Sequence, residues 1–281
     1  MDEKTLQLVS QQLPDLKKGQ IKAALQLMDE GNTIPFIARY RKEATGTLDE
    51  VQLQAVRDQY RHVTNLLERQ ETVINKIKEQ GKLTPALEKR IKAATELQEV
   101  EDLYLPYKQK RQTKAQKAKA AGLAPLANWL LTYPDEDLTK AAAKYVNDEV
   151  PDAQAALDGT HEILAEAISE MATVRGWLRD YTTNHGQLVT KLKRNGEAKD
   201  ELGTYKQYYD FAAPVKDLSS YQILAINRGE KAGVLSVKLT VDTNAVLNYL
   251  HFRLIRTSKR NAATAFITAA YTDALKRFLG P

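Results

Sequence analysis

The 281-residue sequence contains no cysteine. It can therefore form neither a disulfide bond nor a metal site built from thiolates, and its stability must come from packing alone. This composition is typical of a protein that works in a reducing compartment. Function classes that depend on a disulfide framework or on zinc held by thiolates are excluded.

Long apolar runs are also absent. No run approaches the roughly 20 residues that a membrane-spanning helix needs. The first residues, MDEKTLQ, are acidic and polar, and they lack the basic and apolar regions of a signal peptide. With 43% hydrophobic and 27% charged residues, the chain has the composition of a soluble folded protein. We expect a cytoplasmic protein with no membrane partner.

Residue patterns for catalysis or cofactor binding are few. The four histidines, His62, His161, His185 and His251, are far apart and form no pair at positions i and i+4. No GxxxxGK[ST] or GxGxxG motif occurs. Metal-dependent cleavage of phosphodiesters requires converging carboxylates, whereas the acids here alternate with lysines on helix faces. We expect no metal site, no cofactor and no enzymatic activity.

The positive charge is modest but concentrated. The chain has 41 basic and 36 acidic residues, a net charge of +5. No acid occurs between Leu103 and Pro134, and the basic residues that fall together there are Lys108, Lys110, Arg111, Lys114, Lys117 and Lys119. Thr113 and Gly122 are the expected start and stop of a helix. This helix and the tyrosines before it either bind phosphates and bases or form a solvated lysine and alanine surface above buried tyrosines.

A second basic segment lies near the N-terminus. Residues 18–44 form the outline of a helix-turn-helix, in which Gly31 separates two short helices. The second helix carries Arg39, Arg41 and Lys42, and one interpretation makes it a recognition helix that faces nucleic acid. The alternative is a structural corner whose basic residues pair with acids. The acids available for that pairing are Glu43, Asp49 and Glu50.

The longest helix is expected at about residues 48–80. Gly46 ends the preceding helix, and Thr47 with Glu50 is the expected capping box. Apolar residues recur in steps of three and four, and Gln70 fills the one polar slot of a seam that contains Leu53, Val56, Tyr60, Val63, Leu67, Ile74 and Ile77. Such a helix extends about 50 Å at about 1.5 Å per residue and would serve as a spine. A free coiled-coil dimer is disfavoured, because another amphipathic segment follows directly.

The remaining sequence predicts further helices and a small β element. A second long core helix is expected at 160–183. Beyond Gly186, strands are expected at 188–193 and 234–241, a helix at 197–211, and two final helices at 244–256 and 259–279; residues 221–227 are left unassigned. Arg228 and Lys231 are expected in a loop. The fold class is a mainly α, elongated multi-helix array, with a helical domain over 1–185 and a mixed segment over 186–281.

Four segments resemble the bacterial Tex family of transcription accessory proteins, relatives of a eukaryotic elongation factor and histone chaperone. They are IPFIARYRKEATGTLDE (34–50), YLPYKQKRQTKAQKAKAAGLAPLA (104–127), LAINRGEKAGVL (224–235) and FITAAYTDALKRFLGP (266–281). Family members continue into an RNase-H-like domain, a helix-hairpin-helix region and an OB-fold RNA-binding domain. The resemblance implies that this chain is the N-terminal part of such a protein.

Three functional hypotheses follow. The first is a monomeric scaffold that binds RNA or DNA without sequence preference and contacts the transcription machinery. Its expected nucleic-acid-binding residues are Lys108, Lys110, Arg111, Lys114, Lys117, Arg39, Arg41 and Lys42. The second is a structural or protein-binding module that supports RNA-binding domains further along the chain. A nuclease is the third and least supported.

Overall fold

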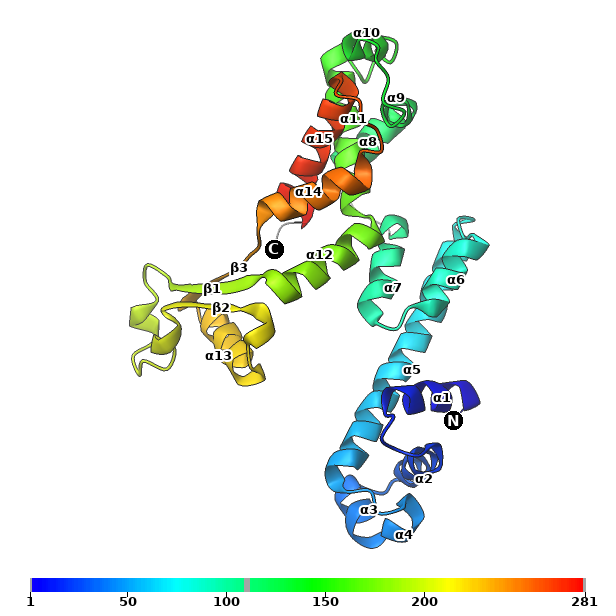
Figure 1. Cartoon of the computed structure of the whole chain (residues 1–281), viewed down its shortest axis with the longest axis vertical. Coiled ribbons are helices and arrows are strands. Elements are labelled where there is room, and N and C mark those ends of the chain that lie inside the picture. Colours follow the sequence, from blue (N-terminus) through cyan, green and yellow to red (C-terminus); the bar gives the residue numbers. More distant parts are fainter. Residues whose placement is uncertain (1, 109–111, 280–281) are drawn as a thin grey trace. The chain divides into compact units, whose positions relative to one another are not determined.

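The computed structural model describes residues 2–108 and 112–279. Within these residues the chain forms fifteen α-helices and one three-stranded antiparallel sheet (Figure 1). The expectation of a mainly α protein with a small β element is confirmed. The chain divides into two compact units, Met1–Tyr107 and Lys108–Pro281. The boundary expected between residues 185 and 186 lies inside the second unit, directly before the first strand.

The first unit is built around one long helix. Its helices are α1 (Glu3–Gln12), α2 (Lys18–Asp29), α3 (Ile34–Tyr40), α4 (Lys42–Thr45), α5 (Glu50–Glu79), α6 (Pro85–Ala93) and α7 (Leu97–Tyr104), followed by a 3-10 turn, Leu105–Tyr107. Helices α1, α2, α3, α6 and α7 all pack against α5. The predicted spine helix is therefore present and organises this unit.

The start and the seam of α5 differ in detail from the prediction. The capping box consists of Asp49 and Gln52, so the predicted pairing of Thr47 with Glu50 is wrong. The buried residues are Leu53, Val56, Val63, Leu66, Gln70, Val73 and Ile77, while Leu67 and Ile74 are only half-buried. In the second half of the helix, Leu66 and Val73 take the buried positions that were predicted for Leu67 and Ile74. The amide of Gln70 donates to the carbonyl oxygen of Ala94 at 2.9 Å, which satisfies the buried polar group.

A short corner joins α2 to α5. Gly31 has a φ of 88° and ends α2, and the side chain of Asn32 donates to the carbonyl oxygen of Leu27 at 2.8 Å. The outline of helix, glycine turn and helix is therefore present. After α3, the separate turn α4 ends at Gly46, whose carbonyl oxygen accepts a hydrogen bond from the side-chain amide of Gln20. This contact ties the corner back to α2.

The helices of the second unit pack around α11. They are α8 (Lys114–Ala120), α9 (Ala124–Leu130), α10 (Leu138–Ala143), α11 (Ala153–Ser169), α12 (Ala172–His185), α14 (Thr243–Leu254) and α15 (Ala262–Ala274), and α15 continues as a π-helical turn, Leu275–Leu279. Helices α8, α9, α10 and α15 all contact α11. A Cβ at Gly159 would lie 2.4 Å from a methyl carbon of Leu123 and 3.2 Å from the Cβ of Ala118. The lack of a side chain at Gly159 thus allows α8 and the start of α9 to approach α11 closely.

The predicted continuous helix at 160–183 is wrong. It is two helices, α11 and α12, because Met171 adopts an extended conformation between them. Apolar spacing continues across this break, so periodicity alone does not reveal it. The final helix, expected from residue 259, begins at Ala262 with Asn261 as its cap.

The sheet has the strand order β2-β1-β3, with β1 (Gln187–Leu192), β2 (Asp210–Pro214) and β3 (Leu235–Thr240). The strands predicted at 188–193 and 234–241 are confirmed as β1 and β3. The predicted helix at 197–211 is wrong, since this segment forms two 3-10 turns and then β2. The unassigned residues 221–227 belong to α13 (Ser220–Lys231), which packs on β3. Arg228 and Lys231 therefore lie on the end of this helix and not in the predicted loop.

Candidate nucleic-acid interface

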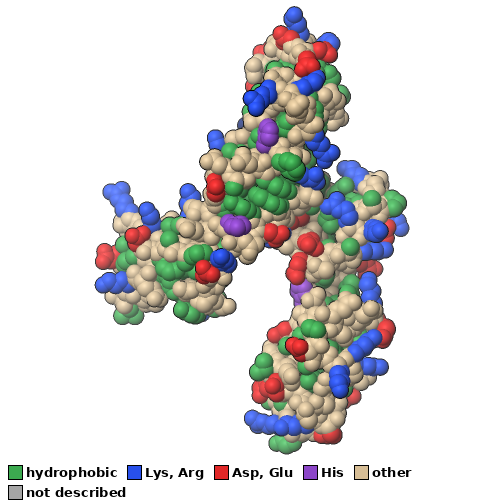
Figure 2. All heavy atoms as spheres, in the orientation of Figure 1, with side chains coloured by type: hydrophobic (Ala, Val, Ile, Leu, Met, Phe, Trp, Pro, Cys, Tyr) green, Lys and Arg blue, Asp and Glu red, His purple; other side chains and the backbone are tan. Residues whose placement is uncertain are grey.

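The first candidate surface is the α3–α4 corner, defined by Phe36, Arg39, Tyr40, Arg41 and Lys42. All five side chains are exposed, with 38% of Phe36 and 64% of Tyr40 open to solvent. The opposite face of α3 is buried in the core of the first unit, so these side chains are held on a packed element. Figure 2 shows Lys and Arg side chains beside apolar ones at the end of the unit that contains α3 and α4.

The aromatic and basic groups of the corner lie close together. The ring centroids of Phe36 and Tyr40 are 5.2 Å apart, with the ring planes at 45°. The guanidinium carbon of Arg41 lies 5.8 Å from the Phe36 centroid, within the range of a cation–π interaction. The corner thus presents π-faces and positive charge over a few ångströms.

The cations of the corner are not neutralised by neighbouring acids. Within residues 2–108, Arg39, Arg41 and Lys42 form no ion pair. Asp49 instead caps α5, accepting a hydrogen bond from the backbone amide of Gln52 at 2.7 Å. The alternative in which these cations pair with nearby acids is therefore not observed, and their charge remains available to an anionic ligand.

The second candidate surface is the basic run on and before α8. Lys108, Lys114, Lys117 and Lys119 are exposed, whereas Lys110 and Arg111 lie outside the described residues. Thr113 caps the helix as expected, accepting a hydrogen bond from the backbone amide of Gln116 at 3.0 Å. The preceding Tyr104 is buried and Tyr107 is half-buried. Tyr104 therefore offers no exposed face on which a base could stack.

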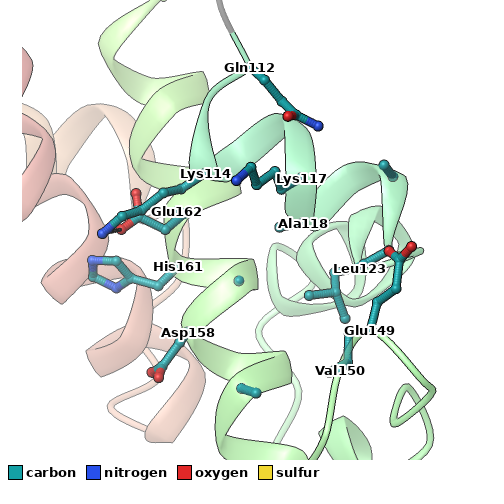
Figure 3. Close-up of a pocket in the computed structure, with 14 residues that line it drawn as sticks. Gln112, Lys114, Lys117, Ala118, Leu123, Glu149, Val150, Asp158, His161 and Glu162 are labelled. Atoms are coloured by element: carbon teal, nitrogen blue, oxygen red, sulfur yellow. Dashed lines mark ion pairs between the residues drawn. The ribbon is translucent and has the colours of Figure 1, made fainter.

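Acids from α11 face the lysines of α8. A groove of about 1010 Å³ is lined by residues of α8, of α11 and of the loop at 149–150 (Figure 3), and its charged lining residues are Lys114, Lys117, Glu149, Asp158 and Glu162. Lys114 lies 3.8 Å from Glu162, and Lys119 lies 3.5 Å from Glu166. The Lys114 side chain remains 79% exposed, so this pairing is weak. The groove nevertheless has mixed charge.

An ion-pair network continues from this groove to the end of α15. Arg277 pairs with Glu162 at 3.0 Å and also with Asp273, which lies 3.1 Å from a ring nitrogen of His161. Burial would raise the pKa of Asp273, but hydrogen bonds from Arg277 and His161 outweigh it and lower that pKa. No group of three or more metal-ligating side chains occurs among the described residues. The network joins α11 to α15.

A further exposed stripe on α13 was missed by sequence reasoning. Tyr221 is 69% exposed and Leu224 is 56% exposed, and Arg228 and Lys231 follow on the same side of the helix. The sequence feature that could have revealed the stripe is the helical spacing of these four residues, which places them opposite the buried Ile226. The stripe combines an apolar end with a basic end.

None of the helices in the described ranges is long and apolar enough to cross a membrane. A smaller basic group near the end of the chain, formed by Arg253, Arg256, Lys259 and Arg260, is exposed, and within it Lys259 pairs with Asp135.

Two family models match the chain. Residues 3–78 match the Tex-like protein N-terminal domain, and residues 133–277 match the Tex central region-like model. The first match contains the α3–α4 corner. The second contains α11, α13 and the sheet.

Several longer proteins are similar to this chain. YdcI of Bacillus subtilis is 38% identical over 269 residues, which cover 95% of this chain and 37% of YdcI. The transcriptional accessory protein Tex of Neisseria gonorrhoeae is 45% identical over 220 residues, 78% of this chain and 29% of that protein. The human S1 RNA-binding domain-containing protein 1 is 30% identical over 225 residues, 77% of this chain and 22% of that protein. The chain thus spans between 22% and 37% of the length of these relatives.

Proposed function

Because the chain belongs to the Tex family, we propose that it is a nucleic-acid-associated scaffold of a transcription accessory protein, which binds RNA or DNA without catalysing a reaction on it. The observation that carries this proposal is the α3–α4 corner, where three exposed cations without ion-pair partners in the described chain lie beside two exposed rings. One relative is named a transcriptional accessory protein, and another has an S1 RNA-binding domain in its name.

The corner is the stronger of the two candidate surfaces. Unpaired cations gain a full phosphate contact on binding, and such contacts release condensed counterions from the nucleic acid. On α8, by contrast, Lys114 and Lys119 must share each contact with the carboxylates of Glu162 and Glu166. The proposal also includes a second basic segment, whose remaining members are Lys108, Lys110, Arg111 and Lys117. Phosphate contacts fix the position of the protein on the nucleic-acid backbone and carry no sequence information.

The test measures binding of the 281-residue chain to a short labelled single-stranded RNA over a range of salt concentrations. Replacing Arg39, Arg41 and Lys42 by alanine removes three phosphate contacts. For a single strand this flattens the salt dependence by about 0.7 per contact, roughly two in all. The double variant Lys114→Ala/Lys119→Ala is the matched control on α8, and we expect a smaller change from it because both lysines already lie beside carboxylates of α11. A folded triple variant with unchanged affinity and slope would move the site away from α3 and α4.

The second candidate function is a structural or protein-binding module. The exposed apolar end of α13, formed by Tyr221 and Leu224, favours it, because contiguous exposed apolar groups often mark interaction sites. The transcription machinery is the class of partner that the relatives' names suggest. If the wild-type chain binds neither RNA nor DNA at physiological salt, this function is favoured over the first.

A further inference from the structure

We propose that the exposed face of α13 is a docking site for an acidic amphipathic helix of a partner protein, which packs antiparallel to α13 with its acids at its own N-terminal end. The face consists of Tyr221, Leu224, Arg228 and Lys231, with Ile223 at its edge. This inference rests on the protein-binding function, the second candidate, and names its class of partner. It does not depend on nucleic-acid binding.

The apolar end of this face is a cluster of side chains. Tyr221, Ile223 and Leu224 are 69%, 40% and 56% exposed. The other exposed large apolar side chains in the described part of the second unit, such as Leu131 and Phe252, stand singly in the sequence. Single exposed apolar residues are ordinary, whereas contiguous apolar patches mark interaction sites. The cluster therefore indicates a surface that another molecule covers.

The packing of α13 holds this face outward. The helix lies beside the sheet (Figure 1) and packs on β3. On the packed side Ile226 is fully buried, and a Cβ at Gly229 would lie 2.7 Å from a methyl carbon of Leu235. A capping box of Ser219 and Gln222 fixes the start of the helix. A partner therefore meets a preformed surface, which lowers the entropic cost of association.

The charge of the other end selects the partner. Arg228 and Lys231 are exposed, and neither forms an ion pair within residues 112–279. The one acid among the exposed residues of α13, Glu230, lies two turns after Ile223 and so falls at the edge of the face. Complementary charge on a partner is therefore negative and lies against the C-terminal end of α13.

The spacing of the face predicts a helical partner and its direction. The four residues follow one another at steps of three, four and three, which is the spacing of a seam between paired helices. Antiparallel packing places the partner's N-terminus beside Arg228 and Lys231, where acids are also favoured by the partner's own helix dipole. Parallel packing would place those acids at the C-terminal end of the partner, against its dipole. The expected partner segment thus has acids in its first turns, followed by apolar residues at steps of three and four.

A second copy of this chain does not fit the face. Antiparallel pairing of two α13 helices about a two-fold axis would place Tyr221 and Leu224 of each copy against Arg228 and Lys231 of the other. The cations would then lose water without gaining an acid, which is unfavourable. Parallel pairing would set like charges against each other.

The experiment titrates the 281-residue chain with three designed fluorescent peptides of equal length and measures anisotropy. The first has glutamates in its N-terminal turns and leucines at steps of three and four in the remainder. The second has the same residues in reverse order, and the third has lysines in place of the glutamates. We expect the first peptide to bind most tightly, by about two- to fivefold over the second, and added salt to reduce its advantage over the third.

Two variants test the two ends of the face. Tyr221→Ser/Leu224→Ser removes the apolar contacts and should weaken binding of the first peptide at least about tenfold. Arg228→Glu/Lys231→Glu replaces attraction by repulsion, so it should weaken the first peptide by more than about fivefold and make the lysine peptide the tighter ligand.

The matched controls lie on α14, which also carries an exposed ring and exposed arginines. Phe252 is 83% exposed, and Arg253 and Arg256 are exposed near it in the chain. Phe252→Ser and Arg253→Glu/Arg256→Glu should leave binding of all three peptides unchanged. Circular dichroism confirms that each variant is folded.

Several outcomes would overturn the proposal. Equal affinity for the glutamate and lysine peptides would remove its electrostatic basis, and unchanged binding by the α13 variants would remove the site. A dimer of the wild-type chain that Leu224→Ser dissociates would assign the face to a second copy. If a full-length relative that carries the four residues of the face does not bind the first peptide, its own later domains cover this face.

Binding of single-stranded RNA, measured in parallel, separates this inference from the nucleic-acid proposal. A wild-type chain that binds the first peptide but no RNA supports the inference and overturns the nucleic-acid function. Loss of RNA affinity on Arg228→Glu/Lys231→Glu with unchanged peptide affinity would instead assign these cations to nucleic acid, and the inference would be wrong.

Discussion

Asp200 organises the irregular segment between β1 and β2. Its buried carboxylate accepts hydrogen bonds from the backbone amides of Thr204 at 2.7 Å and Tyr205 at 2.8 Å, and from the hydroxyl of Tyr209 at 3.0 Å. Burial would raise the pKa of this carboxyl group, but the hydrogen bonds favour the charged form more strongly and lower its pKa below the ordinary 3.8. One acid thus fixes a segment that has no regular helix.

This arrangement predicts a pH-dependent effect of Asp200→Asn. Because the folded-state pKa lies below that of the unfolded chain, the charged carboxylate stabilises the fold above about pH 3.8, and this stabilisation is lost as the pH falls through the folded-state value. We expect Asp200→Asn to lower the melting temperature at neutral pH, with a difference from the wild type that narrows in acid. The measurement is thermal unfolding over a pH series, with Asp217→Asn as the exposed control. A difference that stays constant with pH would contradict the assignment.

At the scale of elements, the buried face of α5 gives the clearest prediction. Val73 is fully buried and Leu66 nearly so, whereas Asn65 on the same helix is exposed. Burial of an unpaired charge costs several kcal/mol, a large share of a typical total of about 5 to 15 kcal/mol. We expect Leu66→Asp or Val73→Asp to unfold the first unit or to lower its melting temperature severely, and Asn65→Asp to have little effect. Leu67→Asp should be intermediate, because Leu67 is half-buried. Equal melting temperatures for Val73→Asp and the wild type would show that α5 is not the core helix.

The sequence predicted those elements whose signal is long and periodic. Helix α5 and strands β1 and β3 were found because their apolar residues repeat over many positions. The break at Met171 was missed because the apolar spacing runs through it. The segment 197–211 was misassigned because its conformation depends on the hydrogen bonds of Asp200 and not on any repeat.

The candidate site was predictable only in part. The cations at Arg39, Arg41 and Lys42 were evident in the sequence, but whether acids pair with them depends on the three-dimensional arrangement. For α8 the local sequence contains no acid, yet in the structure Lys114 and Lys119 have acidic partners. Its partners come from α11, and Glu166 lies 47 residues from Lys119. Charge runs in a sequence therefore do not give the charge of a surface, because long-range packing decides which cations remain free.

At the scale of the whole molecule, each unit has its own apolar core. One buried cluster lies within residues 6–63 of the first unit, and another lies within residues 115–279 of the second. A unit with its own core has the main requirement for folding alone. This division allows the two candidate surfaces to be tested on separate fragments, since the α3–α4 corner belongs to the first unit and α8 belongs to the second.

We therefore predict that fragments 1–107 and 108–281 each fold, and that the first retains the salt-sensitive binding of single strands. All five residues of the corner and the core that positions them lie in residues 1–107, so replacing Arg39, Arg41 and Lys42 by alanine should weaken binding by this fragment as we expect it to in the whole chain. The measurement is circular dichroism with thermal melting for folding, and fluorescence anisotropy for binding. Binding confined to 108–281 would assign the activity to the lysines of α8, in spite of the carboxylates of α11 that face them. Binding by the whole chain but by neither folded fragment would mean that both units must contribute contacts to one strand.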